Sequence, residues 1–172
     1  MSAVEIRETT PDEVAAVLAL YPVAFPEEEL RPLVAALLEA GPDVLSLAGV
    51  DGASVVGHVL FTRCGGGERT GALLGPLGVH PDHQRQGLGT ALVRAGLSRL
   101  EEAGTAQVFV LGSPGYYGRF GFLPERGVCP PYPLPEAWAE AWQSLLLAER
   151  APLPAGPLPL PDPWMDAALW AP

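Results

Sequence analysis

The sequence predicts one α/β (α+β) domain whose elements follow the order β-α-α-β-β-β-α-β-α-β. Three observations predict it. Short stretches of alternating polarity are typical of strands, and longer stretches with apolar residues every three or four positions are typical of helices. The stretch 108–111 is entirely apolar, as in a central strand. The chain has 172 residues and is 48% hydrophobic, which is sufficient for a packed core.

The N-terminal half is predicted to hold a strand, two helices and a three-stranded meander. A capping box of Thr10 and Glu13 marks a helix start, Gly41-Pro42 marks a helix end, and Asp51-Gly52 marks a hairpin turn. The acidic residues Glu27–Glu29 are expected in the first turn of the second helix. The elements are expected at 4–7 (strand), 10–20 and 27–40 (helices), and 44–50, 54–63 and 72–79 (strands).

The C-terminal half is predicted to begin with an amphipathic helix, which Gly104 ends. After Gly127 the composition shifts to proline, leucine and tryptophan. Residues 143–148 fit either a continued helix or a final strand, and we favour the strand. Trp164 and Trp170 suggest that the tail folds back onto the body rather than forming a free arm. The elements are expected at 86–103 (helix), 108–111 (strand), 114–119 and 135–141 (short helices), with an extended piece beginning at Phe122.

The loop between strand 72–79 and helix 86–103 has the features of an anion site. The first N–H groups of a helix have no intrahelical partner, and the positive end of the helix dipole points the same way. Gly87 and Gly89 would let a phosphate approach the backbone closely. A P-loop is excluded because no Gly-Lys-Ser/Thr follows, and the dinucleotide fingerprint because position 92 is leucine rather than glycine.

Two motifs together resemble one known family. The spacing Gln84-x-x-Gly87-x-Gly89 is similar to the pyrophosphate loop of the GCN5-related N-acetyltransferases (the GNAT superfamily). Tyr117-Gly118-Arg119-Phe120-Gly121-Phe122 resembles the Tyr-x-x-x-Gly-Phe motif of the same family, in the same order along the chain. Within this superfamily we suspect the YhbS-like predicted acetyltransferases. The resemblance implies the GNAT acyl-CoA N-acyltransferase fold, a mixed central β-sheet with helices on both faces. It also implies a GNAT core at 1–127 and a Pro/Trp-containing extension at 128–172 packed on the core as a single domain.

The resemblance implies acetyl-CoA as cosubstrate, without a metal. The backbone of the strand before the loop, at Leu77 and Val79, would pair with pantetheine or with the thioester carbonyl, and Gly78 permits close approach. Arg85 either adds a charge-assisted hydrogen bond to the pyrophosphate or is a solvated loop charge. Ser113 lies where many family members have an asparagine that holds pantetheine. The predicted cofactor-binding residues are Leu77, Gly78, Val79, Gln84, Arg85, Gln86, Gly87, Leu88, Gly89, Thr90, Ser113, Tyr117 and Phe120.

Two residues are candidates for catalysis. Tyr117 occupies the tyrosine position of the family motif, and its phenol could protonate or hydrogen-bond the departing thiolate. Many relatives carry a glutamate base on the central strand, but 72–76 has none. His58 is the remaining candidate base, and its alternative role is a hydrogen-bonded histidine within a strand. A water chain that carries the proton of the amine to solvent would make a base unnecessary.

The composition restricts the partners. The net charge of −10 argues against nucleic acid, and it either favours a cationic substrate or only keeps the chain in solution. The sequence has neither an apolar run of membrane-spanning length nor a signal pattern at its start, so we expect a cytoplasmic protein. Cys64 and Cys129 lack metal-ligand spacing. A monomer and a homodimer both remain open.

The predicted function is N-acetyl transfer from acetyl-CoA to a primary amine of a small molecule or peptide by direct attack. The alternative is a catalytically weak coenzyme A-binding regulatory module with the same fold. The acceptor is expected to enter near Phe25–Glu29 and the segment that follows Tyr117, since loop chemistry varies most there.

Overall fold

The computed structural model describes residues 3–65 and 67–172, which fall into two compact units. The first unit is Met1–Thr62 with Gly75–Arg99, and the second is Arg63–Leu74 with Leu100–Pro172. Strand β4 contributes its first half to the second unit and its second half to the first unit. In the described residues, no helix combines the length and the apolar character that crossing a membrane requires.

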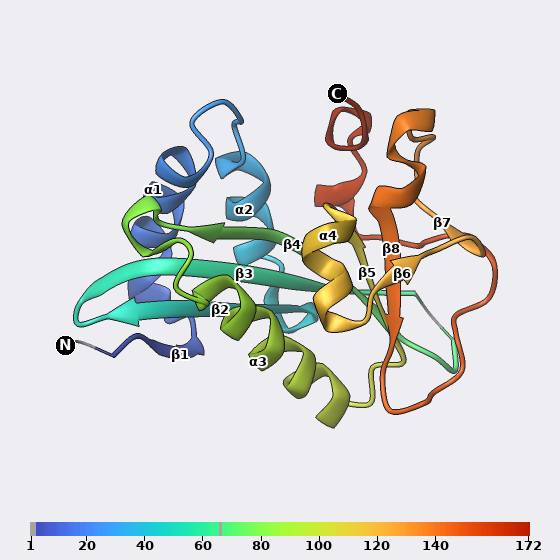
Figure 1. Cartoon of the computed structure of the whole chain (residues 1–172), viewed down its shortest axis with the longest axis horizontal. Helices are drawn as coiled ribbons and strands as arrows, with labels where there is room; N and C mark the ends of the chain where they lie inside the picture. Colours follow the sequence, from blue (N-terminus) through green and yellow to red (C-terminus); the bar gives the residue numbers. More distant parts are fainter. Residues whose placement is uncertain (1–2, 66) are drawn as a thin grey trace. The chain divides into compact units, whose positions relative to one another are not determined.

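The order of the main elements is the one predicted (Figure 1). The helices are α1 (Val14–Ala24), α2 (Arg31–Leu38), α3 (Leu88–Glu102) and α4 (Pro114–Tyr117). The strands are β1 (Glu5–Glu8), β2 (Val44–Asp51), β3 (Ser54–Cys64), β4 (Gly71–Val79), β5 (Gln107–Leu111), β6 (Leu123–Pro124), β7 (Val128–Cys129), β8 (Trp142–Leu146) and β9 (Gly156–Pro157). The ambiguous stretch near residue 143 is therefore a strand, as we favoured.

The main sheet is mixed and has seven strands in the order β1-β2-β3-β4-β5-β8-β6. Strands β1, β2 and β3 pair antiparallel, β4 and β5 pair parallel, and β8 pairs antiparallel with both β5 and β6. The parallel pairing joins Gly71–Leu74 to Gln107–Val110. The mixed sheet confirms the predicted fold class.

Helices cover both faces of the sheet in the first unit. A Cβ atom added to Gly57 on β3 would lie 3.0 Å from side-chain atoms of Leu88 and Leu92, so this face of β3 packs against α3. The next residue, His58, points to the opposite face and contacts Tyr21 of α1. This alternation is the two-residue period of a strand. In Figure 1, α1 and α2 lie side by side, in agreement with their contacts.

An aromatic cluster forms the core of the second unit. Phe109 of β5 stacks on Trp142 of β8, with ring centroids 5.6 Å apart, and Trp142 meets Trp170 edge-on at 5.9 Å. The indole Nε1 of Trp170 donates to the carbonyl oxygen of Trp164 at 3.0 Å. Burial of these rings is a large apolar contribution, and the one polar group of Trp170 has a partner. The division of the chain into a core at 1–127 and an extension at 128–172 stays a prediction.

Several helix boundaries differ from the expected ones, and two of the larger differences lie near prolines. Helix α2 begins at Arg31 rather than at Glu27, because a proline at position 32 cannot bond to the carbonyl four residues earlier and is accepted only in a first turn. Glu27–Glu29 therefore precede the helix. Helix α1 continues through Pro22 to Ala24, where the N–H of Phe25 donates to Tyr21.

We expect Gly96→Ala on α3 to destabilise the fold. A Cβ there would lie 2.1 Å from Cε2 of Phe61, whose ring is 1% exposed and has little room to move. Overpacking of this kind costs about 1–3 kcal/mol of unfolding free energy, which urea denaturation measures. Adding Phe61→Leu to the variant should recover part of the loss. A Gly96→Ala protein as stable as the wild type would contradict this packing.

Candidate active site

The loop that follows β4 turns through two left-handed residues before α3 begins. These are Arg85, with φ of 62°, and Gly87, with φ of 81°. The amide Nε2 of Gln84 donates to the carbonyl oxygen of Val79 at 3.0 Å, and that of Gln86 donates to Asp82 at 3.3 Å. Both glutamine side chains thus hold the loop in shape, while residues 84–87 are exposed.

The N-terminus of α3 is open to an anion. The N–H of Ala91 donates to the carbonyl oxygen of Gly87 at 2.9 Å, so the N–H groups of Leu88, Gly89 and Thr90 belong to the first turn, which has no intrahelical acceptors. Acidic side chains commonly complement this end of a helix, yet the first turn of α3, all of it described, contains none. The predicted residues Gln84–Thr90 therefore lie together on one short segment, of which residues 84–87 are exposed.

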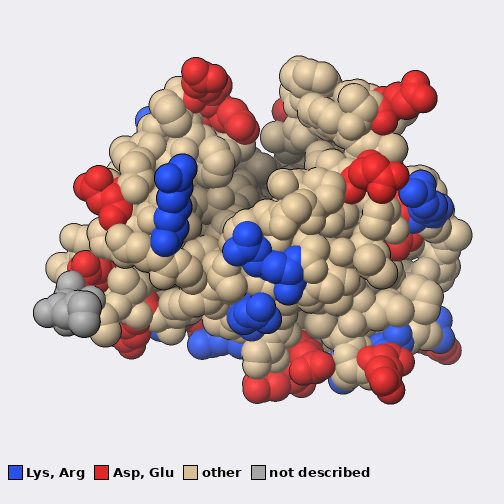
Figure 2. Space-filling model, in the orientation of Figure 1, with Lys and Arg blue, Asp and Glu red and all other residues tan. Residues whose placement is uncertain are grey.

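The charge of the surface fits the same interpretation. All ten basic residues of the sequence are arginines. Figure 2 shows basic side chains gathered over α3 in this view, although the chain as a whole carries a net charge of −10. A local positive region on an acidic protein attracts an anionic group to that place.

Strand β4 presents its main chain before the loop. Leu77 and Val79 are half-buried, and Gly78 is buried between them. A Cβ at Gly78 would lie 3.3 Å from Tyr21 and 3.6 Å from Phe25, so the α1 side of this segment is filled. The peptide between Gly75 and Pro76 is cis. Pro76 has no N–H, so its carbonyl oxygen is its only backbone hydrogen-bonding group.

Tyr117, Ser113 and Phe120 belong to the second unit. The ring of Tyr117 lies against Gly112, where a Cβ would be 2.5 Å from Cε2 of the tyrosine. Burial, with a smaller effect of Tyr116, raises the pKa of Tyr117 well above its ordinary value. The phenol therefore stays protonated near neutral pH and is available as a hydrogen-bond donor.

The neighbours of Tyr117 have structural roles. Ser113 caps α4, since its side chain accepts from the N–H of Tyr116 at 3.4 Å and its carbonyl oxygen accepts from Tyr117 at 3.0 Å. The guanidinium of Arg119 lies 4.4 Å from the ring centre of Tyr116, a cation–π contact. Phe120 packs near Tyr116 and Tyr117, with ring centroids 5.7 and 6.3 Å away. The glycine of the motif, Gly121, has φ of 99°, which explains why a glycine stands there.

His58, the candidate base, is fully buried and bonded at both ring nitrogens. Its Nδ1 lies 2.6 Å from the hydroxyl oxygen of Tyr21, and its Nε2 lies 2.8 Å from the hydroxyl oxygen of Ser46. Burial lowers the pKa of His58 to about 3, so the imidazole is neutral at physiological pH. This geometry favours the hydrogen-bonded histidine that the sequence left as the alternative.

Sequence reasoning did not single out Tyr21 or Ser46. The sequence did indicate that such partners exist, because a histidine inside the apolar strand 55–61 requires hydrogen-bond partners on the neighbouring elements. In the register of β2 and β3, the residue directly opposite His58 is Ala48. Ser46 is therefore a diagonal neighbour of His58. Tyr21 lies on a helix, and its position relative to β3 depends on tertiary packing.

The described residues, 3–65 and 67–172, contain no group of three or more histidine, cysteine, aspartate or glutamate side chains placed to hold a metal ion. Both cysteines are free thiols, Cys64 buried and Cys129 exposed.

A family model decides the classification, because the model of the acetyltransferase (GNAT) family matches residues 14–122, more than half of the chain. The chain belongs to the GNAT acetyltransferase family. The match includes both the loop before α3 and the segment of Tyr117. It confirms the suspected family and the predicted enzyme class, an acyltransferase.

Individual relatives agree with the family. This chain is 38% identical to the uncharacterized N-acetyltransferase YjhQ of Escherichia coli, and the match covers 85% of this chain and 86% of YjhQ. The crystal structure of YhbS from Escherichia coli in complex with CoA superposes with a TM-score of 0.86 and 29% identity, covering 96% of this chain and 94% of that one. A Brucella melitensis GNAT acetyltransferase in complex with acetyl-CoA gives a TM-score of 0.76 and 28% identity, covering 95% and 99%. The ligands of these structures are the predicted cosubstrate and its thiol product.

We expect acid to destabilise the fold through His58. Its pKa is about 3 when folded, below the ordinary 6.5, so between these values the unfolded chain binds a proton that the folded chain does not. The contribution is fully present above pH 6.5 and is lost as the pH falls toward 3, with a slope of at most about 1.4 kcal/mol per pH unit. Urea unfolding at several pH values measures it. His58→Gln should flatten the slope, whereas His80→Gln should retain it. An unchanged slope in His58→Gln would contradict a neutral buried imidazole.

Proposed function

We propose that this chain transfers an acetyl group from acetyl-CoA to the primary amine of a small molecule or peptide by direct attack. The observation that carries the proposal is the exposed loop at 84–87, which leads into a helix N-terminus without acidic side chains. An N-terminus of this kind suits a pyrophosphate, which is the charged part of coenzyme A. Backbone N–H groups of the first turn, with the guanidinium of Arg85, would hold it.

The thioester would lie along the main chain of β4. An N–H aimed at the carbonyl oxygen stabilises the charge that develops when the amine attacks, often the largest catalytic contribution. The family resemblance implies this role for Leu77 and Val79, and both residues are half-buried. Pantetheine would extend along the same segment, as an added strand does.

The reaction forms one bond and breaks one. The nitrogen lone pair of the amine attacks the carbonyl carbon, the carbon–sulfur bond breaks, the amine loses a proton and the thiolate gains one. We propose that the protonated phenol of Tyr117 donates to the thiolate. A catalytically weak binding module is not favoured, because the relatives are named as acetyltransferases.

The acceptor is proposed to enter near the segment between α1 and α2. Glu29 there is paired with Arg31, with oxygen–nitrogen distances of 2.6 and 2.9 Å. Glu27 and Glu28 are exposed and precede the helix, so they are the better candidates to attract a cationic acceptor. The cytoplasmic location and the choice between monomer and homodimer stay predictions.

We expect Tyr117→Phe to slow amine-dependent thiol release by a factor of about 10² or more, because the variant lacks the donor to the thiolate. The assay supplies acetyl-CoA with polyamines, amino acids, aminoglycosides and short peptides. The affinity for acetyl-CoA, measured by calorimetry, should stay within about twofold, since loss of one peripheral hydroxyl costs little binding energy. Tyr116→Phe is the matched control and should retain the wild-type rate. Equal rates for both variants would exclude Tyr117 as the acid.

We expect Gly89→Glu to abolish acetyl-CoA binding, because it places a side chain and a negative charge at the proposed pyrophosphate site. Ser98→Glu adds the same charge to an exposed position further along α3 and should leave binding unchanged. Calorimetry measures both, and circular dichroism shows whether each variant is folded. A folded Gly89→Glu protein with wild-type affinity would overturn the assignment of the loop.

A further inference from the structure

A continuous chain of hydrogen bonds crosses the interior of the first unit. The carbonyl oxygen of Pro76 on β4 lies 3.4 Å from the hydroxyl oxygen of Tyr21, which is 2.6 Å from Nδ1 of His58. Nε2 of His58 is 2.8 Å from the hydroxyl oxygen of Ser46, which is 2.7 Å from that of Thr9. The chain therefore begins at β4 and crosses α1, β3 and β2.

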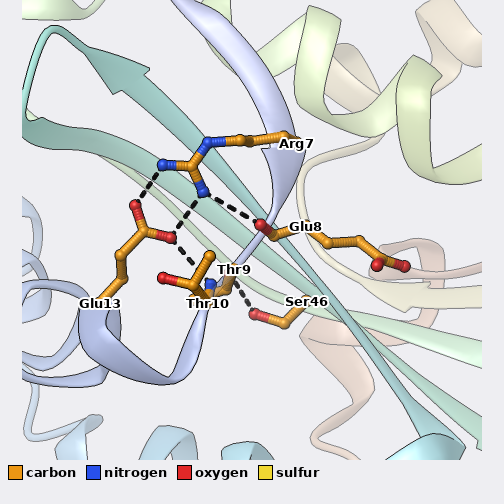
Figure 3. A network of polar contacts seen from close by, with 6 residues as sticks. All are labelled: Arg7, Glu8, Thr9, Thr10, Glu13 and Ser46. Carbon is orange, nitrogen blue, oxygen red and sulfur yellow. Dashed lines mark hydrogen bonds and ion pairs between the residues drawn. The ribbon is translucent and has the colours of Figure 1, made fainter.

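The outer end of the chain opens to a pocket. Thr9 and Ser46 are half-buried, whereas His58 is 0% exposed and Tyr21 is 1% exposed. Both outer residues line a pocket of about 350 Å³, and Glu8 and Thr10 are among its other lining residues. Figure 3 shows the bond between Thr9 and Ser46 at this end.

Each of the four side chains, Tyr21, His58, Ser46 and Thr9, can both donate and accept. A hydroxyl has one proton and free lone pairs, and a neutral imidazole has one nitrogen of each kind. The chain therefore has two polarities. In one, Tyr21 donates to His58, which donates to Ser46, which donates to Thr9. In the other, each proton has moved to the opposite side of its bond. Changing from one polarity to the other moves one proton from β4 to the pocket.

We propose that Tyr21, His58, Ser46 and Thr9 form a proton relay that carries the proton of the attacking amine from strand β4 to solvent. This rests on the proposed acetyl transfer, which assigns the thioester to the segment at Leu77–Val79. When Tyr21 donates to His58, its oxygen and the carbonyl oxygen of Pro76 face each other as two acceptors. Such a place is complementary to an N–H donor, and a primary amine supplies one.

The transfer balances in protons. The amine nitrogen gives one proton to the hydroxyl oxygen of Tyr21, whose own proton passes to Nδ1 of His58. The proton on Nε2 passes to Ser46, the proton of Ser46 passes to Thr9, and Thr9 releases one to water in the pocket. His58 stays neutral before and after, which accords with its low pKa. These four are relay residues, and the hydroxyl of Tyr21 is the group of the relay that lies next to strand β4.

Few charged groups lie near the outer end of the relay in the part of the chain that the structure describes. Of the described residues that line the pocket, Glu8 is the charged one. Beside it, Arg7 and Glu13 pair through bonds of 2.7 and 2.6 Å (Figure 3). The hydrogen bonds from Arg7 lower the pKa of Glu13 to about 2, so this pair stays ionised and exchanges no proton with the relay near neutral pH. Tyr21 and His58 are the titratable groups at the inner end.

The first test is independent of turnover. The chain has three histidines, so ¹⁵N-histidine labelling gives a spectrum that His58→Gln assigns directly. We expect the His58 ring to be neutral from pH 5 to pH 8, with nitrogen shifts between those of the two pure tautomers, because both polarities are populated. Tyr21→Phe should fix a single tautomer. A wild-type His58 that is fixed in one tautomer, or charged at pH 7, would overturn the relay.

The second test measures the kinetics of variants at Thr9, the outer end of the hydrogen-bond relay. Thr9→Val removes the outer hydroxyl while nearly preserving volume, and we expect kcat to fall about tenfold because the last step to solvent is lost. The KM and the affinity for acetyl-CoA should not change, and the proton inventory in mixed H₂O and D₂O should become that of a single proton. Thr9→Ser should restore the wild-type values. Thr10→Val is the matched control, because it makes the same substitution at a neighbouring residue that is not part of the relay.

Two outcomes separate the relay from the function on which it rests. Wild-type kcat and proton inventory in Thr9→Val would overturn the relay while acetyl transfer stands. Tautomer exchange without thiol release from any amine would instead contradict the proposed acetyl transfer, and the relay of an amine proton would be overturned with it.

Discussion

The candidate site depends on where the parallel pairing of β4 and β5 ends. The two strands are joined from Gly71 to Leu74, and beyond this point β4 no longer follows the β5 register. A backbone released from one neighbour must satisfy its polar groups elsewhere, with solvent, side chains or a ligand. In the proposed reaction this release would leave the main chain of Leu77–Val79 for a thioester, and the strand then continues directly into the loop before α3.

The loop and helix use a second constraint, the polarity of the peptide. In the proposed site, backbone N–H groups and a helix end would hold an anion on an acidic protein without a cluster of lysines. Glycines are required at two points for different reasons: Gly87 has a left-handed conformation, and Gly78 has Tyr21 close to where a side chain would be. The proposed acetyl-CoA site is therefore formed mainly by the backbone, and side chains adjust it.

Local patterns predicted the fold and the position of the loop before α3 well, because each rests on short-range rules. The strand alternation, the capping box at Thr10 and the glycine spacing all act within a few residues. Boundaries near prolines were less accurate: Pro32 moved the start of α2, and Pro22 did not end α1. The hydrogen-bond partners of His58 could not be predicted from the sequence, because they lie 37 and 12 residues away along it. A polar residue in an apolar strand signals that partners exist, but only the packed structure names them.

The basic side chains of this protein have one further consequence. All ten are guanidinium groups, which remain charged at any physiological pH and are poor nucleophiles toward a thioester. No side chain among the 172 residues is a primary amine. An acetyltransferase of this composition has no lysine to modify on itself, so no ε-amine of its own competes with the acceptor or accumulates acetyl groups as acetyl-CoA rises.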